Sequence, residues 1–287
     1  MRSKARHEWR IAALALVVLA LGAAVVGCGD DDDDESASSD PVALTIEATS
    51  AEPPAYTAPE TVEAGVVEIT LENNADAQID GQLVRIDGEH ADEEIVGELQ
   101  NAMRGRPVQD WFQGAGGAPS TNPGESSTVT QVLEPGAYYV VGGDAPPADA
   151  LTKITVEGEG GAELPEADGT IVATEYEFAG ENLTAGTQRI EMRNEGEEWH
   201  HFLGGQLKEG ATIEDAREFL ETEKGAPPFA GSEDEGVGTA VFDGGISQIV
   251  EVDLKPGTYA FFCFIADRAG GPPHVAKGMV SEVTVEG

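Results

Sequence analysis

The stretch that decides the fold lies near the C-terminus, where residues 254 to 285 read LKPGTYAFFCFIADRAGGPPHVAKGMVSEVTV. Two strand-like runs in this stretch flank a loop rich in glycine and proline. The first run contains Cys263, the loop carries His274 eleven residues later, and Met279 follows five residues after that. A thiol, an imidazole and a thioether are ligands that several transition metals accept. The stretch therefore predicts a strand-loop-strand unit with metal-binding side chains in its loop.

Alternation along the first run places the thiol. Tyr259, Phe261 and Cys263 share one side of the strand, because successive side chains point to opposite faces. With that side in the core, the thiol lies at the rim of an apolar interior. Phe262 and Phe264 then face outward, where the helical insert or the first domain must cover them.

The nearest candidates for nitrogen ligands outside this stretch are the neighbouring residues His200 and His201. Adjacent strand residues point to opposite faces, so at most one of them is expected to bind the same metal. The strand geometry alone does not decide which. Cys263 is the only cysteine outside the N-terminal segment, and its alternative role is that of a buried packing residue.

Comparison of the chain with itself shows a repeat at a constant offset of 121 residues. The matching segments are Ala64-Gly65 with Ala185-Gly186, Asn73 with Asn194, and LEPGAY at 133–138 with LKPGTY at 254–259. Both copies end on Thr-Val-Glu-Gly. Several anchors at one offset indicate an internal duplication.

Short runs of β-branched and aromatic residues, separated by Gly, Pro and Asn, occupy both copies. This pattern predicts an all-β fold of two tandem, antiparallel Greek-key β-sandwich domains. Each domain is expected to carry one helical insert, at about 91–103 and at 213–224, the second with Thr212 as its N-cap. We expect the first domain at 41–158, a linker at 159–167 and the second domain at 168–287.

The N-terminal residues 1–27 have the pattern of a signal peptide, with basic residues followed by an apolar run of 12 residues from Ile11 to Gly22. Val-Val-Gly-Cys at 25–28 resembles the lipobox of bacterial lipoproteins, which implies lipidation of Cys28. An ordinary signal peptide or a single membrane anchor is the alternative. The acidic segment 28–40 predicts a disordered tether. We therefore expect an exported protein, anchored by lipid to the outer face of the cell membrane.

The charge balance is strongly acidic, with 54 Asp and Glu residues against 16 Lys and Arg residues and a net charge of −38. Nucleic acid is excluded as a partner, because few basic groups are present to neutralise phosphates. Charges spread along the whole chain favour solvation, and high external salt would screen their mutual repulsion. Steering of a basic redox partner is the weaker alternative.

Three motifs together resemble the cupredoxin, or type 1 blue copper, family. They are Asn194-x-Gly196-x-x-x-His200, Pro256-Gly257-x-Tyr259-x-x-x-Cys263, and HVAKGM at 274–279. The resemblance covers residues 168–287 and extends in part to the first copy. It implies a cupredoxin-like fold and one copper ion in the second domain.

The ligands implied by this resemblance are His200 and His274 as imidazoles, Cys263 as thiolate and Met279 as the weak axial ligand. His201 is the alternative to His200, and it stands where the family usually has a bracing asparagine. The gap between Cys263 and His274 holds ten residues, more than is usual in plastocyanins or azurins.

The first copy provides an internal control for the metal site. At the offset of 121, Ile79 corresponds to His200 and Gly142 to Cys263. The first copy is also eight residues shorter after the aligned tyrosine, so the loop bearing His274 is largely absent. We therefore expect the first domain to keep the fold without a metal site. Its only histidine, His90, is expected to be a solvated surface residue.

The function predicted from these observations is a membrane-tethered blue-copper protein that carries single electrons to or from an unidentified redox partner. His274 is expected to present its ring edge near the surface, where an electron can leave. The protein is expected not to be an enzyme, because five histidines, one of them in the signal peptide, cannot supply a second metal cluster. The alternatives are a surface copper-binding or copper-delivery lipoprotein and a metal-free cupredoxin-like binding scaffold.

Overall fold

The computed structural model describes residues 40–142, 145–231 and 236–287. The predicted signal peptide, the lipidation site Cys28 and residues 28–39 of the acidic tether lie outside this part of the chain. Residues from Asp40 to Gly287 belong to one compact unit. Within the described ranges, no helix combines the length and apolar character needed to cross a membrane.

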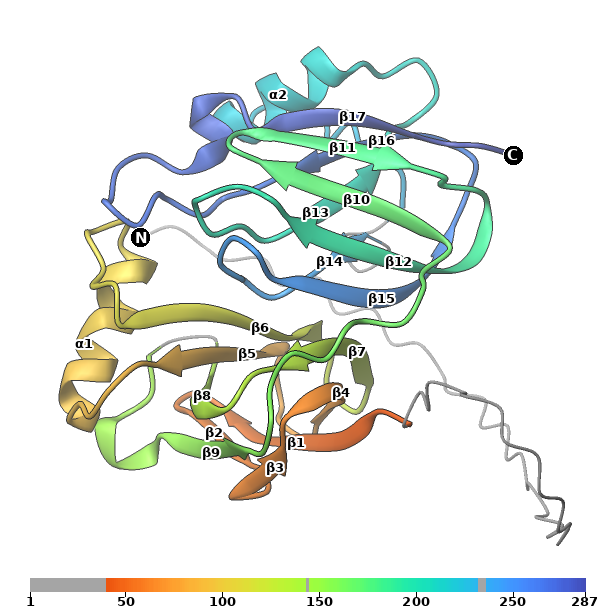
Figure 1. The fold of residues 1–287 in the computed structure, drawn as a ribbon. Coiled ribbons are helices and arrows are strands. Elements are labelled where there is room, and N and C mark those ends of the chain that lie inside the picture. Colours follow the sequence, from red (N-terminus) through yellow and green to blue (C-terminus); the bar gives the residue numbers. More distant parts are fainter. Residues whose placement is uncertain (1–39, 143–144, 232–235) are drawn as a thin grey trace, which may run out of the picture. The chain divides into compact units, whose positions relative to one another are not determined.

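The first repeat is built almost wholly from strands (Figure 1). Its elements are β1 (Val42–Ala51), β2 (Pro54–Thr57), β3 (Thr61–Glu63), β4 (Gly65–Asn73), β5 (Ile79–Ile86), α1 (Asp92–Met103), β6 (Phe112–Thr121), β7 (Ser126–Leu133), β8 (Gly136–Val141), η1 (Ala148–Ala150) and β9 (Thr152–Glu157). The strands form because apolar residues alternate with polar ones. In β4, for example, Val67, Ile69 and Leu71 are buried while the residues between them are partly or fully exposed.

The second repeat follows the same order. Its elements are β10 (Gly169–Thr174), β11 (Glu177–Glu181), β12 (Gly186–Asn194), β13 (Leu203–Gln206), α2 (Ile213–Thr222), β14 (Val237–Gly238), β15 (Ser247–Leu254), β16 (Gly257–Phe262), η3 (His274–Lys277) and β17 (Val280–Val285). Both helices occupy equivalent places, since α1 begins at Asp92 and α2 begins 121 residues later at Ile213. Thr212 caps α2 as predicted, and its hydroxyl accepts a hydrogen bond from the Asp215 N–H at 3.2 Å.

The two repeats share one eight-stranded sheet, in the order β11-β10-β12-β15-β7-β4-β1-β2. Each repeat adds a second sheet of its own, β3-β9-β8-β5-β6 in the first and β14-β13-β16-β17 in the second. The all-β class with a helical insert in each repeat is thus confirmed. The expectation of antiparallel strands is wrong for three strand pairs, because β1 runs parallel to β4, β3 to β9 and β10 to β12.

The repeats meet where β7 pairs with β15. The pairing is antiparallel, and Val129 lies opposite Val250, its own equivalent at the offset of 121. An antiparallel contact between equivalent residues has local twofold symmetry, as in the isologous interface of a homodimer. One hydrophobic cluster runs through this joint and contains buried residues of both repeats, including Leu71, Met192 and Cys263. The two sandwiches therefore have a continuous core.

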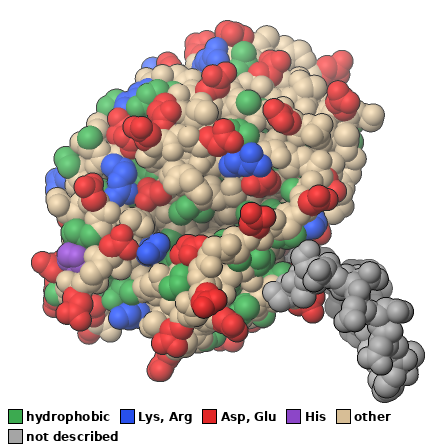
Figure 2. All heavy atoms as spheres, in the orientation of Figure 1, with side chains coloured by type: hydrophobic (Ala, Val, Ile, Leu, Met, Phe, Trp, Pro, Cys, Tyr) green, Lys and Arg blue, Asp and Glu red, His purple; other side chains and the backbone are tan. Residues whose placement is uncertain are grey.

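Acidic side chains are spread over the surface. Figure 2 shows Asp and Glu side chains across the whole visible face, with fewer Lys and Arg side chains among them. The distribution agrees with a general solvating role for the excess negative charge.

Candidate metal centre

Cys263 follows directly after β16, which ends at Phe262. Tyr259, Phe261 and Cys263 are all buried, and Cys263 is fully inaccessible, so the predicted core-facing side of the strand is confirmed. On the other side Phe262 is half-buried with its ring 5.7 Å from that of Phe229, which lies near the β13 edge. Phe264 remains 42% exposed.

His200 is held in place by the backbone of Phe242. The two residues exchange both N–H to carbonyl hydrogen bonds, each 3.0 Å long. The ring of His200 points toward His274, and the two Nδ1 atoms lie 3.0 Å apart. His201 points elsewhere, because its Nε2 accepts a hydrogen bond of 2.8 Å from the backbone N–H of Phe264. The geometry therefore favours His200 over His201 as the partner of His274.

The long loop after Cys263 is closed at its base. The carbonyl of Cys263 accepts a hydrogen bond from Val275 N–H, and the carbonyl of Ile265 accepts one from His274 N–H, each at 2.8 Å. An isolated bridge between Ala266 and Pro273 continues this pairing. The ten intervening residues therefore do not keep His274 away from Cys263.

His200, Cys263 and His274 form a cluster whose candidate ligand atoms all lie within 4.8 Å of one another. All three residues are buried. Met279 is also fully buried and belongs to the same hydrophobic cluster as Cys263, and its N–H donates to the His274 carbonyl at 3.0 Å. The structure thus brings together three of the four predicted ligands, and it buries Met279 in the same hydrophobic cluster as Cys263.

Burial sets the protonation of this cluster. It raises the pKa of the Cys263 thiol to about 12, although backbone hydrogen bonds from Ile265 and His201 act in the opposite direction. It lowers the pKa of His200 to about 4, with a further contribution from His274. The imidazole of His200 is therefore neutral and ready to bind a metal ion. The thiol of Cys263 must lose its proton when the metal binds.

His274 has a second partner on its outer side. Its Nε2 lies 3.0 Å from Asp267 Oδ1, and Asp267 also binds Lys277 Nζ and the hydroxyl of Tyr176, the latter at 3.0 Å. Burial raises the pKa of Asp267, but Lys277, Tyr176 and His274 together outweigh it, so that pKa lies below its usual value. A carboxylate on the far nitrogen fixes the ring orientation and tautomer of a metal-binding histidine.

These contacts correct one prediction and add residues that sequence reasoning missed. His274 was expected near the surface, but it is fully buried beneath the Asp267 network. Asp267 and Tyr176 were not predicted, because they lie 91 residues apart and neither belongs to a recognisable motif. The only available signal for Asp267 was a carboxylate within the ligand loop itself.

The first repeat has no room for a thiol at the equivalent position. A Cβ placed on Gly142 would overlap the side-chain and backbone oxygens of Asp80 and the hydroxyl of Tyr56. The Tyr56 hydroxyl donates a 2.6 Å hydrogen bond to the Asp80 carbonyl, and Ile79 is buried in the core where the second repeat has His200. Tyr56, Ile79 and Asp80 thus occupy the region that corresponds to the metal site.

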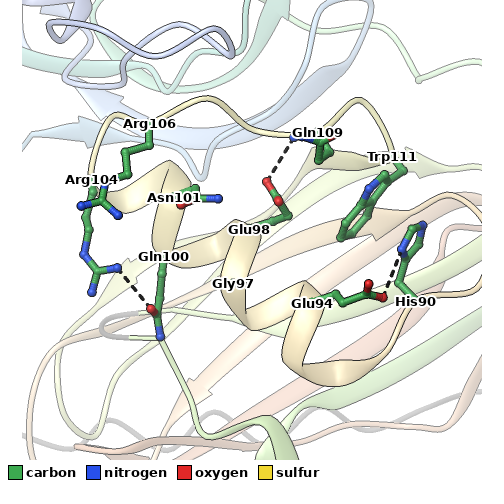
Figure 3. Close-up of a pocket in the computed structure, with 10 residues that line it drawn as sticks. All are labelled: His90, Glu94, Gly97, Glu98, Gln100, Asn101, Arg104, Arg106, Gln109 and Trp111. Atoms are coloured by element: carbon green, nitrogen blue, oxygen red, sulfur yellow. Dashed lines mark hydrogen bonds and ion pairs between the residues drawn. The ribbon is translucent and has the colours of Figure 1, made fainter.

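His90 in the first repeat lies far from this cluster in the sequence and has its own partners. Its ring stacks on Trp111 at 3.7 Å between centroids, and its Nδ1 lies 3.6 Å from a Glu94 carboxylate oxygen (Figure 3). The two rings border a pocket beside α1. His90 is thus partly solvated, with its side chain 22% exposed and its imidazole packed on one face against Trp111.

The donor set of the cluster fits one type 1 copper ion. Two imidazoles, one thiolate and a thioether are the ligands of blue-copper sites, and they occur here in the chain order that the sequence resemblance implied. The ligand set resembles that of the cupredoxins. Within the described residues, only the second repeat brings such ligands together.

Of the comparisons with known proteins, only that with solved structures found matches. No family model matches the chain, and no curated protein matches it. Among solved structures, auracyanin A, named as a blue copper protein of *Chloroflexus aurantiacus*, is 18% identical, with 41% of this chain and 99% of that chain covered and a TM-score of 0.30. At this similarity, we rest the assignment of the site on its own geometry.

Two further matches span both repeats. A copper nitrite reductase from *Nitrosomonas europaea* is 15% identical over 85% of this chain and 93% of that chain, with a TM-score of 0.22. A multicopper oxidase is 13% identical over 85% and 88%, with a TM-score of 0.21. The prediction that the protein is not an enzyme is overturned by these matches, because proteins that match across both repeats carry the names of enzymes.

Proposed function

We propose that the protein binds one type 1 copper ion between His200, Cys263, His274 and Met279 and uses it to accept and release one electron at a time. The observation that carries the proposal is the convergence of three buried ligand residues on one point, with their ligand atoms within 4.8 Å. When bound, copper at such a site supplies a one-electron redox couple.

The protein residues contribute a rigid and dry environment. Cys263 and Met279 belong to the apolar core, and the Phe178 ring lies edge-on to His200 with 6.5 Å between centroids. Asp267 holds the outer nitrogen of His274. Ligands fixed in this way change little between two oxidation states, which favours fast electron transfer.

Visible absorption of the Cu(II)-loaded protein tests the proposal. An intense band from thiolate-to-copper charge transfer is expected in the wild type and is expected to disappear in Cys263→Ala and His274→Ala. His90→Ala is the matched control, because His90 stacks on Trp111 in the first repeat and its loss should leave the band unchanged. A colourless copper-loaded wild type, or a band that survives Cys263→Ala, would contradict the proposal.

Copper capture or delivery at the cell surface is the competing function. It requires ligands that exchange copper readily, whereas Cys263 and His274 are fully buried. Burial therefore favours retention of the ion and supports electron transfer. Incubation of the copper-loaded protein with a strong chelator separates the two, because slow loss of copper with a reversible voltammetric wave fits an electron-transfer site, and rapid loss without a wave fits delivery.

We also propose that the protein is exported and held at the outer face of the cell membrane by a lipid on Cys28. The support is the sequence alone, namely the basic and apolar N-terminal runs followed by Val-Val-Gly-Cys. Mass spectrometry of the mature N-terminus together with membrane fractionation tests this. An unmodified N-terminus in the soluble fraction contradicts it. The redox partner is proposed to be another protein.

A further inference from the structure

The ligand loop is longer than closure of the metal site requires. Its base is already tied by the pairs Cys263 to Val275 and Ile265 to His274. The residues between them, 266–273, extend from this base and include much of the additional length that the first repeat lacks. We call residues 266–273 the loop tip. Its contacts show what the additional length does.

The backbone of the loop tip binds the first repeat. Val108 N–H donates to the Arg268 carbonyl at 2.9 Å, and Gly271 N–H donates to the Gly105 carbonyl at 3.0 Å. Both partners belong to the segment between α1 and β6. That segment is fixed within its own repeat, since Gln109 N–H donates to Glu98 on α1 at 3.1 Å (Figure 3).

The Arg268 side chain crosses the same boundary. Its guanidinium donates to the carbonyls of Gln109 at 3.0 Å and Phe112 at 2.7 Å, both in the first repeat. It also binds both carboxylate oxygens of Asp243, at 3.0 and 3.2 Å. One guanidinium nitrogen, Nη1, makes both contacts. The Arg268 and Asp243 side chains are only 19% and 18% exposed, so this ion pair is largely shielded from water.

Asp243 leads from Arg268 to the other imidazole ligand. It follows Phe242, whose backbone exchanges two hydrogen bonds with His200. Asp243 N–H donates to the Gly114 carbonyl at 2.9 Å, and Gly116 N–H donates to the Val241 carbonyl at 2.9 Å, so β6 of the first repeat pairs along residues 241–243. The backbone segment that holds His200 is therefore itself held by the first repeat.

Arg268 also contacts the residues that precede His200. Its backbone N–H donates to Glu198 Oε2 at 2.7 Å, and the carbon of its guanidinium group lies 4.9 Å from the centre of the Trp199 ring. Trp199 in turn donates from Nε1 to the Ala266 carbonyl at 2.6 Å. Arg268 thus contacts three parts of the protein: the segment that carries His200, the segment that carries His274, and the edge of the first repeat.

We propose that the first repeat, whose described residues hold no metal-ligand cluster, is a positioning part of the copper centre in the second repeat, and that Arg268 is the residue that couples them. The proposal rests on the proposed copper function. It also makes a claim about the metal-free protein: the first repeat holds the His200 and His274 segments in place before copper binds.

Amide hydrogen exchange of the metal-free protein tests that claim without copper. In Arg268→Met, the amides of His274 and Val275 at the loop base are expected to exchange on the order of tenfold faster or more, because the loop tip loses its charged anchor. Arg193→Met is the matched control. Arg193 also pairs with carboxylates, those of Glu191 and Glu195, but all three residues lie on or just after β12.

A change made in the first repeat tests the coupling from the other side. A Cβ on Gly105 would lie 3.0 Å from the Gly271 carbonyl oxygen and 3.4 Å from Ala266 Cβ, so Gly105→Ala presses on the loop tip. Gly124→Ala is the control. Gly124 also has a positive φ, of 78° against 59° for Gly105, but a Cβ there meets nothing within 4 Å.

The copper-loaded variants add a spectroscopic readout. Arg268→Met and Gly105→Ala are expected to change the Cu(II) electron paramagnetic resonance and visible spectra, while Arg193→Met and Gly124→Ala keep the wild-type spectra. Circular dichroism confirms that each variant is folded, and Gly105→Ala keeps the test available should Arg268→Met not fold. Wild-type exchange rates and wild-type spectra in folded Arg268→Met and Gly105→Ala would overturn the proposal.

The outcomes separate this proposal from the proposed function. A wild-type protein without a visible copper band refutes the copper function, and the exchange rates at His274 and Val275 in the metal-free protein still decide whether the first repeat positions the loop. A normal band with unchanged exchange rates and spectra in all variants refutes only the positioning role.

Discussion

The adjacent histidines at 200 and 201 serve different purposes because the extended chain turns their rings in different directions. His200 faces His274, with 3.0 Å between the two Nδ1 atoms. His201 accepts the backbone N–H of Phe264, one residue after the thiol, and so braces the start of the ligand loop. His201 thus binds backbone beside the thiol, whereas His200 belongs to the ligand cluster.

Substitution of each histidine is expected to separate these roles. His200→Ala should abolish the visible copper band, because an imidazole ligand is lost. His201→Ala should keep the band and lower the free energy of unfolding of the metal-free protein by about 0.5–1.5 kcal/mol, the net contribution of one hydrogen bond, here that to the Phe264 N–H. Copper titration by absorption and urea unfolding measure the two effects. Loss of the band in His201→Ala with its retention in His200→Ala would reverse the assignment.

Asp243 gives the stability a pH dependence of defined sign. Burial, with a smaller contribution from Glu198, raises its pKa to about 6 against the lowering effects of Arg268 and the Gly114 backbone. In the unfolded chain the pKa of an aspartate is about 4. Between these values the folded state binds more protons than the unfolded state, so this group's contribution to stability falls as the pH rises from about 4 to about 6.

Comparison with Asp243→Asn isolates that contribution, since the amide does not titrate. The free energy of unfolding of the wild type, minus that of the variant, should decrease by roughly 1–3 kcal/mol between about pH 4 and about pH 7. Urea unfolding at several pH values measures the difference. A difference that stays constant or increases with pH would show that Arg268 keeps the Asp243 carboxylate ionised throughout.

Among the elements, the two hairpins that follow the LEPGAY and LKPGTY segments show how one fold carries a site in one copy and not in the other. In the second repeat Cys263 follows β16 and enters an apolar core. In the first repeat Gly142 follows β8, and Asp80 and Tyr56 fill the space beside it. The difference lies in the packing around one position.

A methyl group at Gly142 tests this packing. Gly142→Ala is expected to lower the free energy of unfolding by about 1–3 kcal/mol, because the Cβ overlaps Asp80 and Tyr56. Gly97→Ala in α1 is the control, since a Cβ there meets nothing within 4 Å, and it should raise stability by about 0.5–1 kcal/mol. Denaturant unfolding of both variants measures the contrast, and equal effects would show that the first repeat has room at this position.

The sequence was sufficient to predict the helices and the metal ligands, but not the residues that support the ligands. The repeat offset predicted both helices, and local spacing with the family resemblance predicted His200, Cys263, His274 and Met279. Arg268 could not be predicted, because its side-chain partners lie 25 to 159 residues away and only the folded chain brings them together. Asp267 lies only seven residues from His274, but its contact with Tyr176, 91 residues away, likewise depends on the folded chain. The parallel pairing of β1 with β4 also leaves no trace in hydrophobic alternation, which is the same for both strand directions.

For the molecule as a whole, the dominant electrostatic feature is the excess of acidic side chains, 54 against 16 basic ones. Most of these groups lie on the surface, where their repulsion is screened by added salt (Figure 2). The midpoint of thermal unfolding is therefore expected to rise between low and molar NaCl or KCl. Calorimetry in both salts measures it. A midpoint that stays flat or falls would mean that surface repulsion contributes little to the stability.

The joint between β7 and β15 has a consequence for how the chain associates. Because Val129 and Val250 are equivalent and lie opposite each other, each repeat presents an edge that complements the corresponding edge of any other repeat, in the same chain or in another. The connecting segment from residue 158 to 168 gives the partner edge an effective concentration in the millimolar range. At ordinary protein concentrations, the two repeats of one chain should therefore pair with each other. As the protein concentration approaches the millimolar range, repeats of different chains should pair as well.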